Sequence, residues 1–278
     1  MFQAETNFLN PFTNLNFTIM KKYLSFLFVA FLMASISISC SKDDDDDDDD
    51  TVIEAAMIAE VTATWGWDGD SQETWKYTYD DQKRLIEVEN YWEGALDKTF
   101  TYDYSTAGKL FITRTGQSPV EYDVDSEGRI IKEYWSETEW AAYEYNAAGF
   151  MTRIIEHWGG EDHIKWDIEV ISDNITKHTR YDDEGNVNRI KTFTYTIGDN
   201  VNNINEAIVE SSWKTVTGLY GKTSKKLVDY LDYWNGPGDE ANTKRTTLSY
   251  QFDDKNRVSV LTRAGDGWTE TFEYTYVE

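Results

Sequence analysis

A nine-residue pattern that recurs along the chain constrains its fold more than any other feature of the sequence. Each copy, such as YTYDDQKRL, has aromatic or apolar residues, then a polar turn that usually holds Gly or Asn beside a base, then an aliphatic residue. The copies are Tyr77–Leu85, Tyr102–Leu110, Tyr122–Ile130, Tyr143–Met151, Thr179–Val187 and Tyr250–Val258, with turn positions Lys83, Gly108, Gly128, Gly149, Gly185 and Asn256. The first four turn positions are 25, 20 and 21 residues apart, whereas the later intervals of 36 and 71 residues indicate degenerate or interrupted repeats.

Each copy predicts a β-hairpin. Alternating aromatic residues before the turn are typical of a strand with one packed face, an Asp or Asn at the bend can bond its own backbone, and Gly supplies a positive φ. A period near 20 residues accommodates two strands and two turns. We therefore predict that residues 52–278 form a single all-β domain, an antiparallel meander of repeated hairpins. Its sheet should be strongly twisted or rolled, because a flat single layer would expose the aromatic side chains.

The start of this domain predicts strands at residues 57–65 and 74–79, which are joined through residues 66–71. Residues 201–210 fit either a short helix or another strand, and the periodicity does not decide between them.

A second rhythm places tryptophans where the returning strands should end. The segments NYWEG, EYWSE, EHWGG and DYWNG contain Trp92, Trp135, Trp158 and Trp234. Because neighbouring strand residues point to opposite faces, one ring of each pair should pack inward and the other face outward. A row of exposed rings with nearby carboxylates suits carbohydrate. The alternative is that the rings cover the sheet and pair across strands, at about 0.2–1 kcal/mol per pair.

The first fifty residues predict a targeting segment rather than part of the folded domain. From Met20 the chain has two lysines, an apolar stretch and small residues before Cys40, which is the layout of a secretory signal peptide over residues 20–39. Residues 37–40 resemble a bacterial lipobox, which implies that Cys40 is acylated and that several acyl chains anchor the protein to a membrane. A transmembrane anchor with an incidental cysteine is the alternative. Residues 1–19 have no place in a signal peptide, so Met20 is the expected true start.

Eight aspartates, Asp43–Asp50, follow the cysteine. Like charges repel one another and stay solvated, which predicts a tether over residues 40–51. The run Ser41, Lys42, Asp43 and Asp44 resembles the lipoprotein export signal of Bacteroidota, which implies display on the outer face of the outer membrane. A calcium-binding tract is the rival interpretation, although a chain without a preformed cage binds such ions weakly. Residues 50–52 resemble the O-glycan acceptor tripeptide of that phylum.

Charge and cysteine content exclude several functions. Residues 51–278 hold 42 of the 51 acidic residues but only 23 of the 26 basic ones. Such an acidic domain repels phosphate backbones, so no nucleic-acid partner is expected. Membrane contact is expected only through the lipid at Cys40. Because Cys40 is the only cysteine, an intramolecular disulfide is impossible, and thiol catalysis in the folded part is excluded.

The nine-residue pattern resembles the YD repeat of the RHS family and of its small relatives among Bacteroidota lipoproteins, a group largely without assigned function. The resemblance covers the chain from Tyr77 to the C-terminus in patches. Lys83 and Asn256 depart from it where the family pattern has Gly, and the Tyr-Asp pair is broken in YEYN and YDYS. RHS toxins end in a toxin domain, but here the repeat material runs to Glu278, so that activity is not expected.

Catalytic and metal-binding motifs are absent or incomplete. The chain contains no GxSxG, HExxH, P-loop or GxGxxG sequence. His157, Glu161 and His163 are a weak metal-binding candidate, since two histidines near one turn are usually surface residues. Asp123–Gly128 resembles the front of a calcium loop, but its twelfth position is Tyr134 rather than Glu.

We therefore expect no catalytic residue, no metal site and no cofactor, and a non-enzymatic structural or interaction module on the cell surface that binds carbohydrate through the four tryptophans. Three rivals stay open. A protein partner could bind a strand edge or an acidic face, a hydrolase could use acidic residues that the sequence does not identify, and a half-barrel could carry lipid if it had a concave apolar face.

Overall fold

Every strand of the protein pairs with its neighbours along the chain. The computed structural model describes residues 56–65, 71–199, 218–236 and 242–278. The strands are β1 (Ile58–Trp65), β2 (Ser71–Tyr79), β3 (Leu85–Trp92), β4 (Ala95–Asp103), β5 (Lys109–Arg114), β6 (Val120–Val124), β7 (Ile130–Tyr134), β8 (Trp140–Tyr145), β9 (Met151–Trp158), β10 (Glu161–Ile171), β11 (Asn174–Tyr181), β12 (Val187–Asp199), β13 (Lys226–Trp234), β14 (Lys244–Phe252), β15 (Val258–Gly265) and β16 (Trp268–Tyr276).

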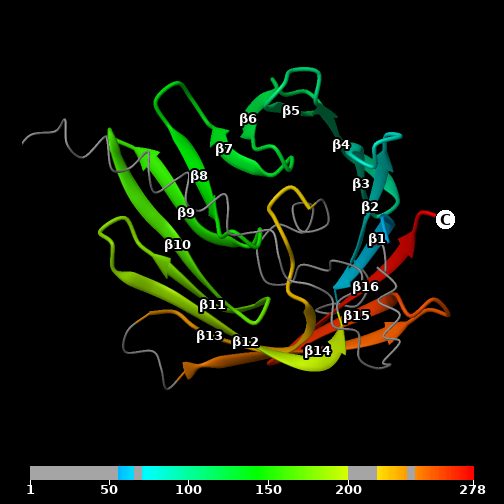
Figure 1. Ribbon diagram of the computed structural model, residues 1–278. Helices are drawn as coiled ribbons and strands as arrows, with labels where there is room; N and C mark the ends of the chain where they lie inside the picture. Colours follow the sequence, from blue (N-terminus) through cyan, green and yellow to red (C-terminus); the bar gives the residue numbers. More distant parts are fainter. Residues whose placement is uncertain (1–55, 66–70, 200–217, 237–241) are drawn as a thin grey trace, which may run out of the picture. The chain divides into compact units, whose positions relative to one another are not determined.

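The sheet closes on itself. All strand pairs are antiparallel, and β1 pairs with β16 from Ile58↔Tyr276 to Trp65↔Glu270, so the meander forms a barrel (Figure 1). This confirms the predicted all-β hairpin meander with a rolled sheet. The first expected strand corresponds to β1, and the second begins three residues earlier than predicted, at Ser71.

Several predictions concern segments outside the described residues. These are the start at Met20, the signal peptide, acylation of Cys40, the export signal and tether that include Ser41, Lys42, Asp43 and Asp44, and the choice between helix and strand for residues 201–210. Within the described ranges, no helix is long and apolar enough to cross a membrane.

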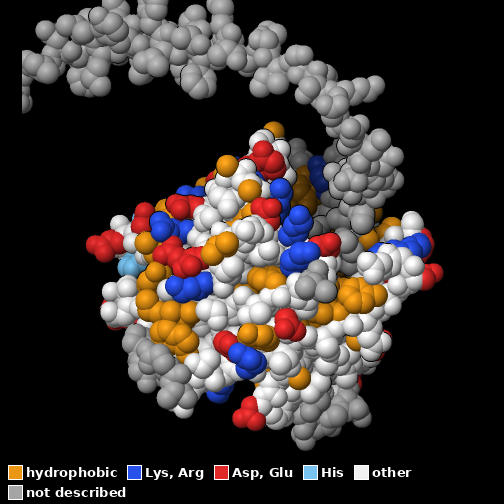
Figure 2. Space-filling view, turned by 60° about the horizontal axis from the view of Figure 1, so that its bottom comes forward, with side chains coloured by type: hydrophobic (Ala, Val, Ile, Leu, Met, Phe, Trp, Pro, Cys, Tyr) orange, Lys and Arg blue, Asp and Glu red, His pale blue; other side chains and the backbone are white. Residues whose placement is uncertain are grey.

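Alternation along the strands separates an apolar interior from a polar exterior. On β2, Trp75 and Tyr77 are buried, whereas Lys76 and Thr78 between and after them are exposed. The outer face of the described strands carries charged and hydroxyl side chains at mid-strand positions, and Figure 2 shows charges of both signs spread over one side. A barrel that spans a bilayer has an apolar outer band about 25 Å tall. The described strands carry no such band.

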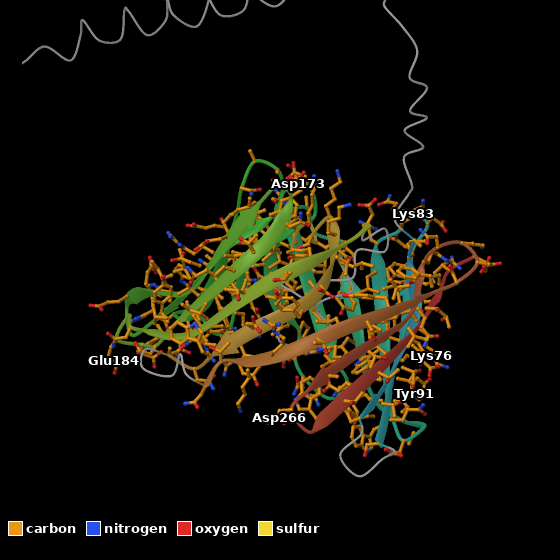
Figure 3. All side chains as sticks on the ribbon, turned by 90° about the horizontal axis from the view of Figure 1, so that it is seen from below. Lys76, Lys83, Tyr91, Asp173, Glu184 and Asp266 are labelled. Carbon is orange, nitrogen blue, oxygen red and sulfur yellow. The ribbon has the colours of Figure 1, made fainter. Side chains whose placement is uncertain are left out.

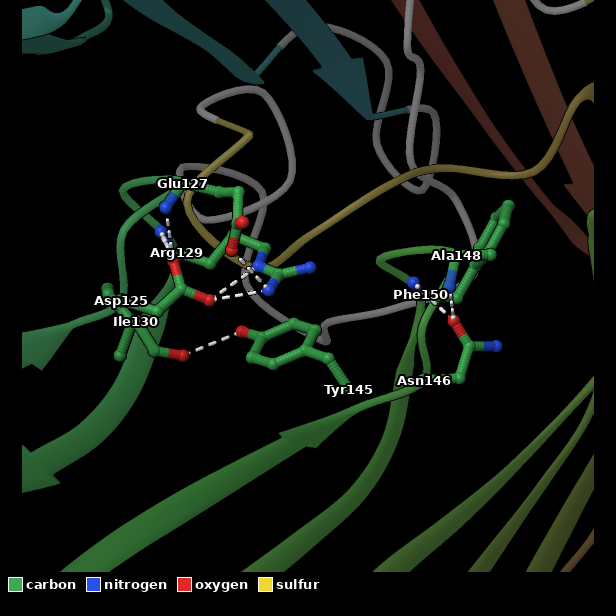
Figure 4. Close-up of polar contacts among 8 residues, drawn as sticks. All are labelled: Asp125, Glu127, Arg129, Ile130, Tyr145, Asn146, Ala148 and Phe150. Atoms are coloured by element: carbon green, nitrogen blue, oxygen red, sulfur yellow. Dashed lines mark hydrogen bonds and ion pairs between the residues drawn. The ribbon is translucent and has the colours of Figure 1, made fainter. Parts of the chain in front are cut away.

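The repeated pattern builds a turn that is held by its aspartate. In the third copy, Asp125 Oδ1 accepts hydrogen bonds from the backbone N–H groups of Glu127 (3.0 Å) and Arg129 (2.9 Å), and Oδ2 accepts one from Arg129 Nε at 2.7 Å (Figure 4). Burial opposes ionisation of Asp125, but its hydrogen bonds with Arg129 outweigh burial and lower the pKa of the carboxyl group. Asp80 and Asp253 hold their turns through the same three bonds.

The tyrosines of the pattern tie neighbouring strands together near these turns. Tyr145 OH donates to the carbonyl of Ile130 at 2.6 Å, and the Arg129 guanidinium lies 4.7 Å from the centre of the Tyr145 ring (Figure 4). Tyr79 of the first copy donates to the carbonyl of Ile58 at 2.9 Å in the same way, and Tyr276, beyond the last copy, donates to that of Val258. Each of the aromatic, acidic and basic positions of the pattern therefore makes a defined contact, and the residue at the turn position supplies the positive φ. All six predicted turn positions have a positive φ.

The two ends of the barrel use different turns. Five copies of the pattern turn at one end, the turn end, defined by Lys83, Gly108, Gly128, Gly149 and Asn256. The opposite end, where β3, β9 and β13 finish in tryptophan, is called the tryptophan end. Figure 3 shows Lys83 and Asp173 toward the turn end and Glu184 and Asp266 toward the other.

The fifth copy, Thr179–Val187, forms the predicted hairpin between β11 and β12, but its turn lies at the tryptophan end rather than at the turn end. Between Gly149 and Gly185 the chain makes three strands instead of two. The additional reversal at the turn end is a tight turn in which Ser172 and Asp173 both have a positive φ (49° and 61°), as a two-residue hairpin requires. This extra strand explains the interval of 36 residues.

A strap of residues 218–225 crosses the turn end, coloured yellow-orange in Figure 1. The carbonyl of Leu219 accepts a bond from Ile130 N at 2.8 Å, and Lys222 N donates to the carbonyl of Gly149 at 2.9 Å. Ser224 Oγ accepts from Ile175 N at 3.0 Å. Leu219 and Tyr220 are buried, so the strap contributes side chains to the core at this end.

Exchanging the residues at two turn positions should change stability in opposite directions. Lys83 holds a left-handed backbone (φ 62°) that disfavours any residue with a Cβ, so Lys83→Gly should raise the free energy of unfolding by about 0.5–1 kcal/mol. Gly128→Lys should lower it by about 1–2 kcal/mol, through the backbone alone, because no atom lies within 4 Å of an added Cβ. Urea unfolding measures both, and shifts of the same sign would contradict the prediction.

Candidate binding site at the tryptophan end

The four tryptophans that were predicted to contact a ligand lie at the same end of the barrel but on different faces of the sheet. Trp92 is paired with Glu73, and Glu73 with the buried Ala63, so Trp92 faces the interior. Trp158 also faces inward, because it lies two residues after Glu156 on the same strand, and Glu156 pairs with the buried Ala141. Trp234 occupies the opposite parity, next to the inward-facing Tyr233, and lies on the outer wall. The expected opposition of neighbouring rings is thus confirmed, but Trp234 does not share a face with Trp92 and Trp158.

Ring contacts show how much of each tryptophan is used in packing. Trp92 stacks on Trp65, with ring centres 5.7 Å apart, and Trp158 stacks on His163 at 4.0 Å. Trp158 and His163 lie on the paired strands β9 and β10, as the packing interpretation predicts, whereas Trp65 and Trp92 lie on β1 and β3 with β2 between them. Trp92 nevertheless keeps 47% of its surface exposed, and Trp135, which follows β7, keeps 48%. Trp92 at the inward-facing end of β3, and Trp135 directly after β7, therefore each keep about half of their surface exposed to solvent.

A cavity of about 270 Å³ lies on the inner wall along β4, β5 and β6, the strands between these two tryptophans, and neither ring is among its lining residues. Its floor is formed by Phe100 of β4, Ile112 of β5 and Tyr122 of β6, all three buried. Trp92 ends β3 on one side of these strands, and Trp135 follows β7 on the other. Four strand spacings separate β3 from β7, which is about 19 Å. The inner wall from β3 to β7 thus presents two half-exposed rings, with a cavity that has an apolar floor on the strands between them.

Polar groups next to this wall face the interior without a complete set of hydrogen bonds. Asn90 is fully buried, and its Nδ2 donates to Glu73 Oε1 at 2.7 Å. Asn90 Oδ1 and the Tyr102 hydroxyl are also buried, and neither has a hydrogen-bond partner in the described part of the chain. Buried polar atoms in proteins are nearly always bonded. These two atoms are therefore exceptions to that rule among the described residues.

A second cavity, of about 450 Å³, lies at the turn end beside the strap. It is lined by Glu127, Arg129, Asn146, Gly149 and Lys222, among others. Among its described lining residues the one carboxylate is that of Glu127, which is paired with Arg129 at 2.8 Å. Neither this cavity nor the one at the tryptophan end brings two carboxylates together, which is the arrangement that a glycoside hydrolase would need.

The weak metal-binding candidates are separated by the sheet. His157 faces outward, where it stacks on Trp140 (ring centres 4.7 Å apart) and its Nδ1 lies 2.6 Å from Asp162 Oδ1. Glu161 and His163 are at inward-facing positions of β10. The described residues contain no group of three or more such side chains able to hold an ion.

Sequence reasoning missed most of the cavity. The alternation of apolar residues at Phe100, Ile112 and Tyr122 placed them on a packed face, and that part of the signal was available. Lys98 and Arg114 line the cavity because of two strand registers, Asn90↔Lys98 and Phe100↔Arg114. Single-strand periodicity does not contain this information.

Comparison with known proteins identifies the fold but not a family. No family model matches the chain, and no curated protein matches it. Among solved structures, it is similar to a porin-like protein from Bacteroides uniformis, with a TM-score of 0.64 and 16% sequence identity over 79% of this chain and 98% of that one. At this level of identity the match establishes a shared β-barrel fold.

One interior residue makes stability depend on pH. His178 is 4% exposed and packs against the rings of Trp166 and Phe193. Burial, with a smaller contribution from Lys191, lowers the pKa of His178 to about 3. An unfolded chain takes up this proton near pH 6.5, but the folded chain does not. The contribution of His178 to the free energy of unfolding is therefore fully present above pH 6.5. It is lost as the pH falls below that value, because only the unfolded chain takes up the proton.

His178→Leu should remove this pH dependence of stability. Below pH 6.5, the free energy of unfolding of the wild-type protein should fall with decreasing pH more steeply than that of the variant, by up to about 1.4 kcal/mol per pH unit. Urea unfolding at pH 7.5, 6.0 and 5.0 measures the difference between the two proteins. Parallel curves for the two would show that His178 does not resist protonation in the fold.

Proposed function

We propose that the protein is a lipid-anchored, cell-surface protein of the outer membrane, a Bacteroidota lipoprotein with YD-like repeats. In this proposal Cys40 is acylated, and Asp43–Asp50 serve as export signal and tether. The polar outer wall supports it, because a barrel without an apolar band gains nothing from entering a bilayer and needs another means of attachment. The similar fold of a porin-like protein from Bacteroides uniformis adds support from the same phylum.

We propose further that the barrel is a non-enzymatic binding module for carbohydrate. The observation that carries this function is the pair of half-exposed rings, Trp92 and Trp135, on either side of the cavity at the tryptophan end. Aromatic faces stack on the C–H faces of sugars, and pockets that are mostly apolar with a few convergent polar groups are the usual form of a ligand site. Trp158 lies farther along the same inner wall, whereas Trp234 on the outer wall has no part in this site.

The rival functions differ in how the fold supports them. Because β1 pairs with β16, the described barrel has no unpaired edge for a partner strand, so a protein partner would have to bind the acidic outer face. Lipid carriage would need a concave, accessible apolar surface, whereas the described core residues are buried and the cavity at the tryptophan end carries Lys98 and Arg114 beside its apolar floor. A hydrolase would need paired acids, and the two cavities described do not supply them.

Removal of the anchor should release the protein. In cells that express Cys40→Ala, the barrel should move from the outer-membrane fraction to the soluble fractions, since the strands do not hold it in the bilayer. Cell fractionation and immunoblotting measure the distribution, and added protease tests display on intact cells. A variant that stays in the membrane fraction through carbonate washing would contradict the proposed anchor.

Removal of the exposed rings should abolish carbohydrate binding. In a glycan screen followed by tryptophan fluorescence titration, Trp92→Ala and Trp135→Ala should each weaken binding about 10-fold or more, because each loses an aromatic contact with the ligand. Trp234→Ala, at the same end but on the outer wall, is the matched control and should bind normally. Equal effects of all three substitutions, or no binding by the wild-type protein, would argue that the rings serve packing alone.

A further inference from the structure

The cavity between Trp92 and Trp135 has two different halves. The floor is apolar and aromatic, with Phe100 7% exposed, Ile112 5% and Tyr122 3%. The other half carries Lys98 and Arg114, together with the polar side chains of the β5–β6 turn, Gln117 and Ser118. An apolar floor next to two cations is the surface that a ring compound with an anionic group would complement.

Lys98 and Arg114 face the interior because of their registers. Lys98 is paired with the buried Asn90, and Arg114 with the buried Phe100. Their positive charges therefore project from the same face of the sheet as the cavity floor. Placed on the outer wall, they would meet solvent and the carboxylates of neighbouring strands instead.

These two cations are less neutralised than those of the outer wall. Several outer-wall bases have close carboxylate partners, as in Arg153–Asp167 and Arg245–Asp232, both at 2.7 Å. Among the residues that the structure describes, no carboxylate lies within ion-pair distance of Arg114. Lys98 contacts only its half-exposed chain neighbour Asp97, at 3.3 Å, an exposed pair of little energetic value.

The scarcity of carboxylates around Arg114 is notable in this chain, in which acids outnumber bases by 51 to 26. Among the inward-facing residues of the described strands, that balance is reversed. Inward-facing basic residues on the described strands include Lys98, Arg114, Arg180, Arg189, Lys191, Lys244 and Arg263, against the acidic Glu73, Glu133, Glu156, Glu161 and Glu270. A cavity lined by one sign of charge inside a low-dielectric wall focuses the field and concentrates ligands of the opposite sign.

We propose that the cavity binds a ring-bearing carboxylate. The guanidinium of Arg114 presents parallel N–H donors that match the two oxygens of a carboxylate, Lys98 supplies the second positive charge, and the ring of the ligand lies against Phe100 and Tyr122. A uronic acid residue of an acidic glycan and a free aromatic carboxylate share this chemistry. The inference rests on the proposed carbohydrate function only for the choice between these two sources.

Three probes distinguish the sources, tested by calorimetric titration on the detergent-solubilised full chain: an oligosaccharide of galacturonic acid, the matching oligosaccharide of galactose, and phenylacetate. The variants are Arg114→Gln and Lys98→Gln. Arg245→Gln on the outer wall is the matched control because it removes the same charge far from the cavity. Thermal unfolding of each variant checks that the barrel remains folded.

The expected result is that the acidic oligosaccharide binds about 10-fold or more tightly than the neutral one, that Arg114→Gln removes this preference, and that Arg245→Gln preserves it. Binding of phenylacetate alone, with the same dependence on Arg114, would support the cavity while ending the carbohydrate proposal. Equal binding of the acidic and neutral oligosaccharides would overturn the inference and leave carbohydrate binding intact. An affinity unchanged by Arg114→Gln, or no binding of any probe, would also overturn it.

Discussion

The antiparallel pairing of β1 with β16 is the constraint on which the rest of the structure depends. An open meander of this composition would have two unpaired edges and two solvated faces, and its aromatic side chains would have nowhere to be buried. Closure removes the edges and gives every strand an inner and an outer side. The burial pattern of each strand then follows, with Val61 and Ala63 of β1 facing Phe272 and Tyr274 of β16 across the seam.

The repeated pattern serves this closure from one end. In the third copy, Asp125 holds its own turn, and Arg129 of the same turn lies over the ring of Tyr145 on β8. Each turn therefore also positions the hairpin that follows it. The insertion of the tight turn at Ser172 and Asp173 places the next copy at the opposite end, and the barrel tolerates this because the registers on both sides of it are maintained by ordinary strand pairing.

The sequence predicted local structure better than long-range structure, for physical reasons. Turn positions such as Gly128 and Asn256 were recognisable because positive φ and self-bonding aspartates are properties of a few adjacent residues. The hairpin meander and the rolled sheet followed from the alternation of apolar residues. The closure of the barrel, the outward position of Trp234, and the meeting of Lys98 with Arg114 were not predictable, since each depends on strand registers and bulges that the alternation leaves undetermined.

The direction of β1 gives the molecule a polarity along the barrel axis. Ile58 begins this strand at the turn end, and Trp65 finishes it at the other, seven residues and about 24 Å away. The described chain therefore enters the barrel at the end opposite the tryptophans. If the protein is anchored and binds carbohydrate as proposed, the point where the chain enters the barrel and the binding site lie a full strand length apart.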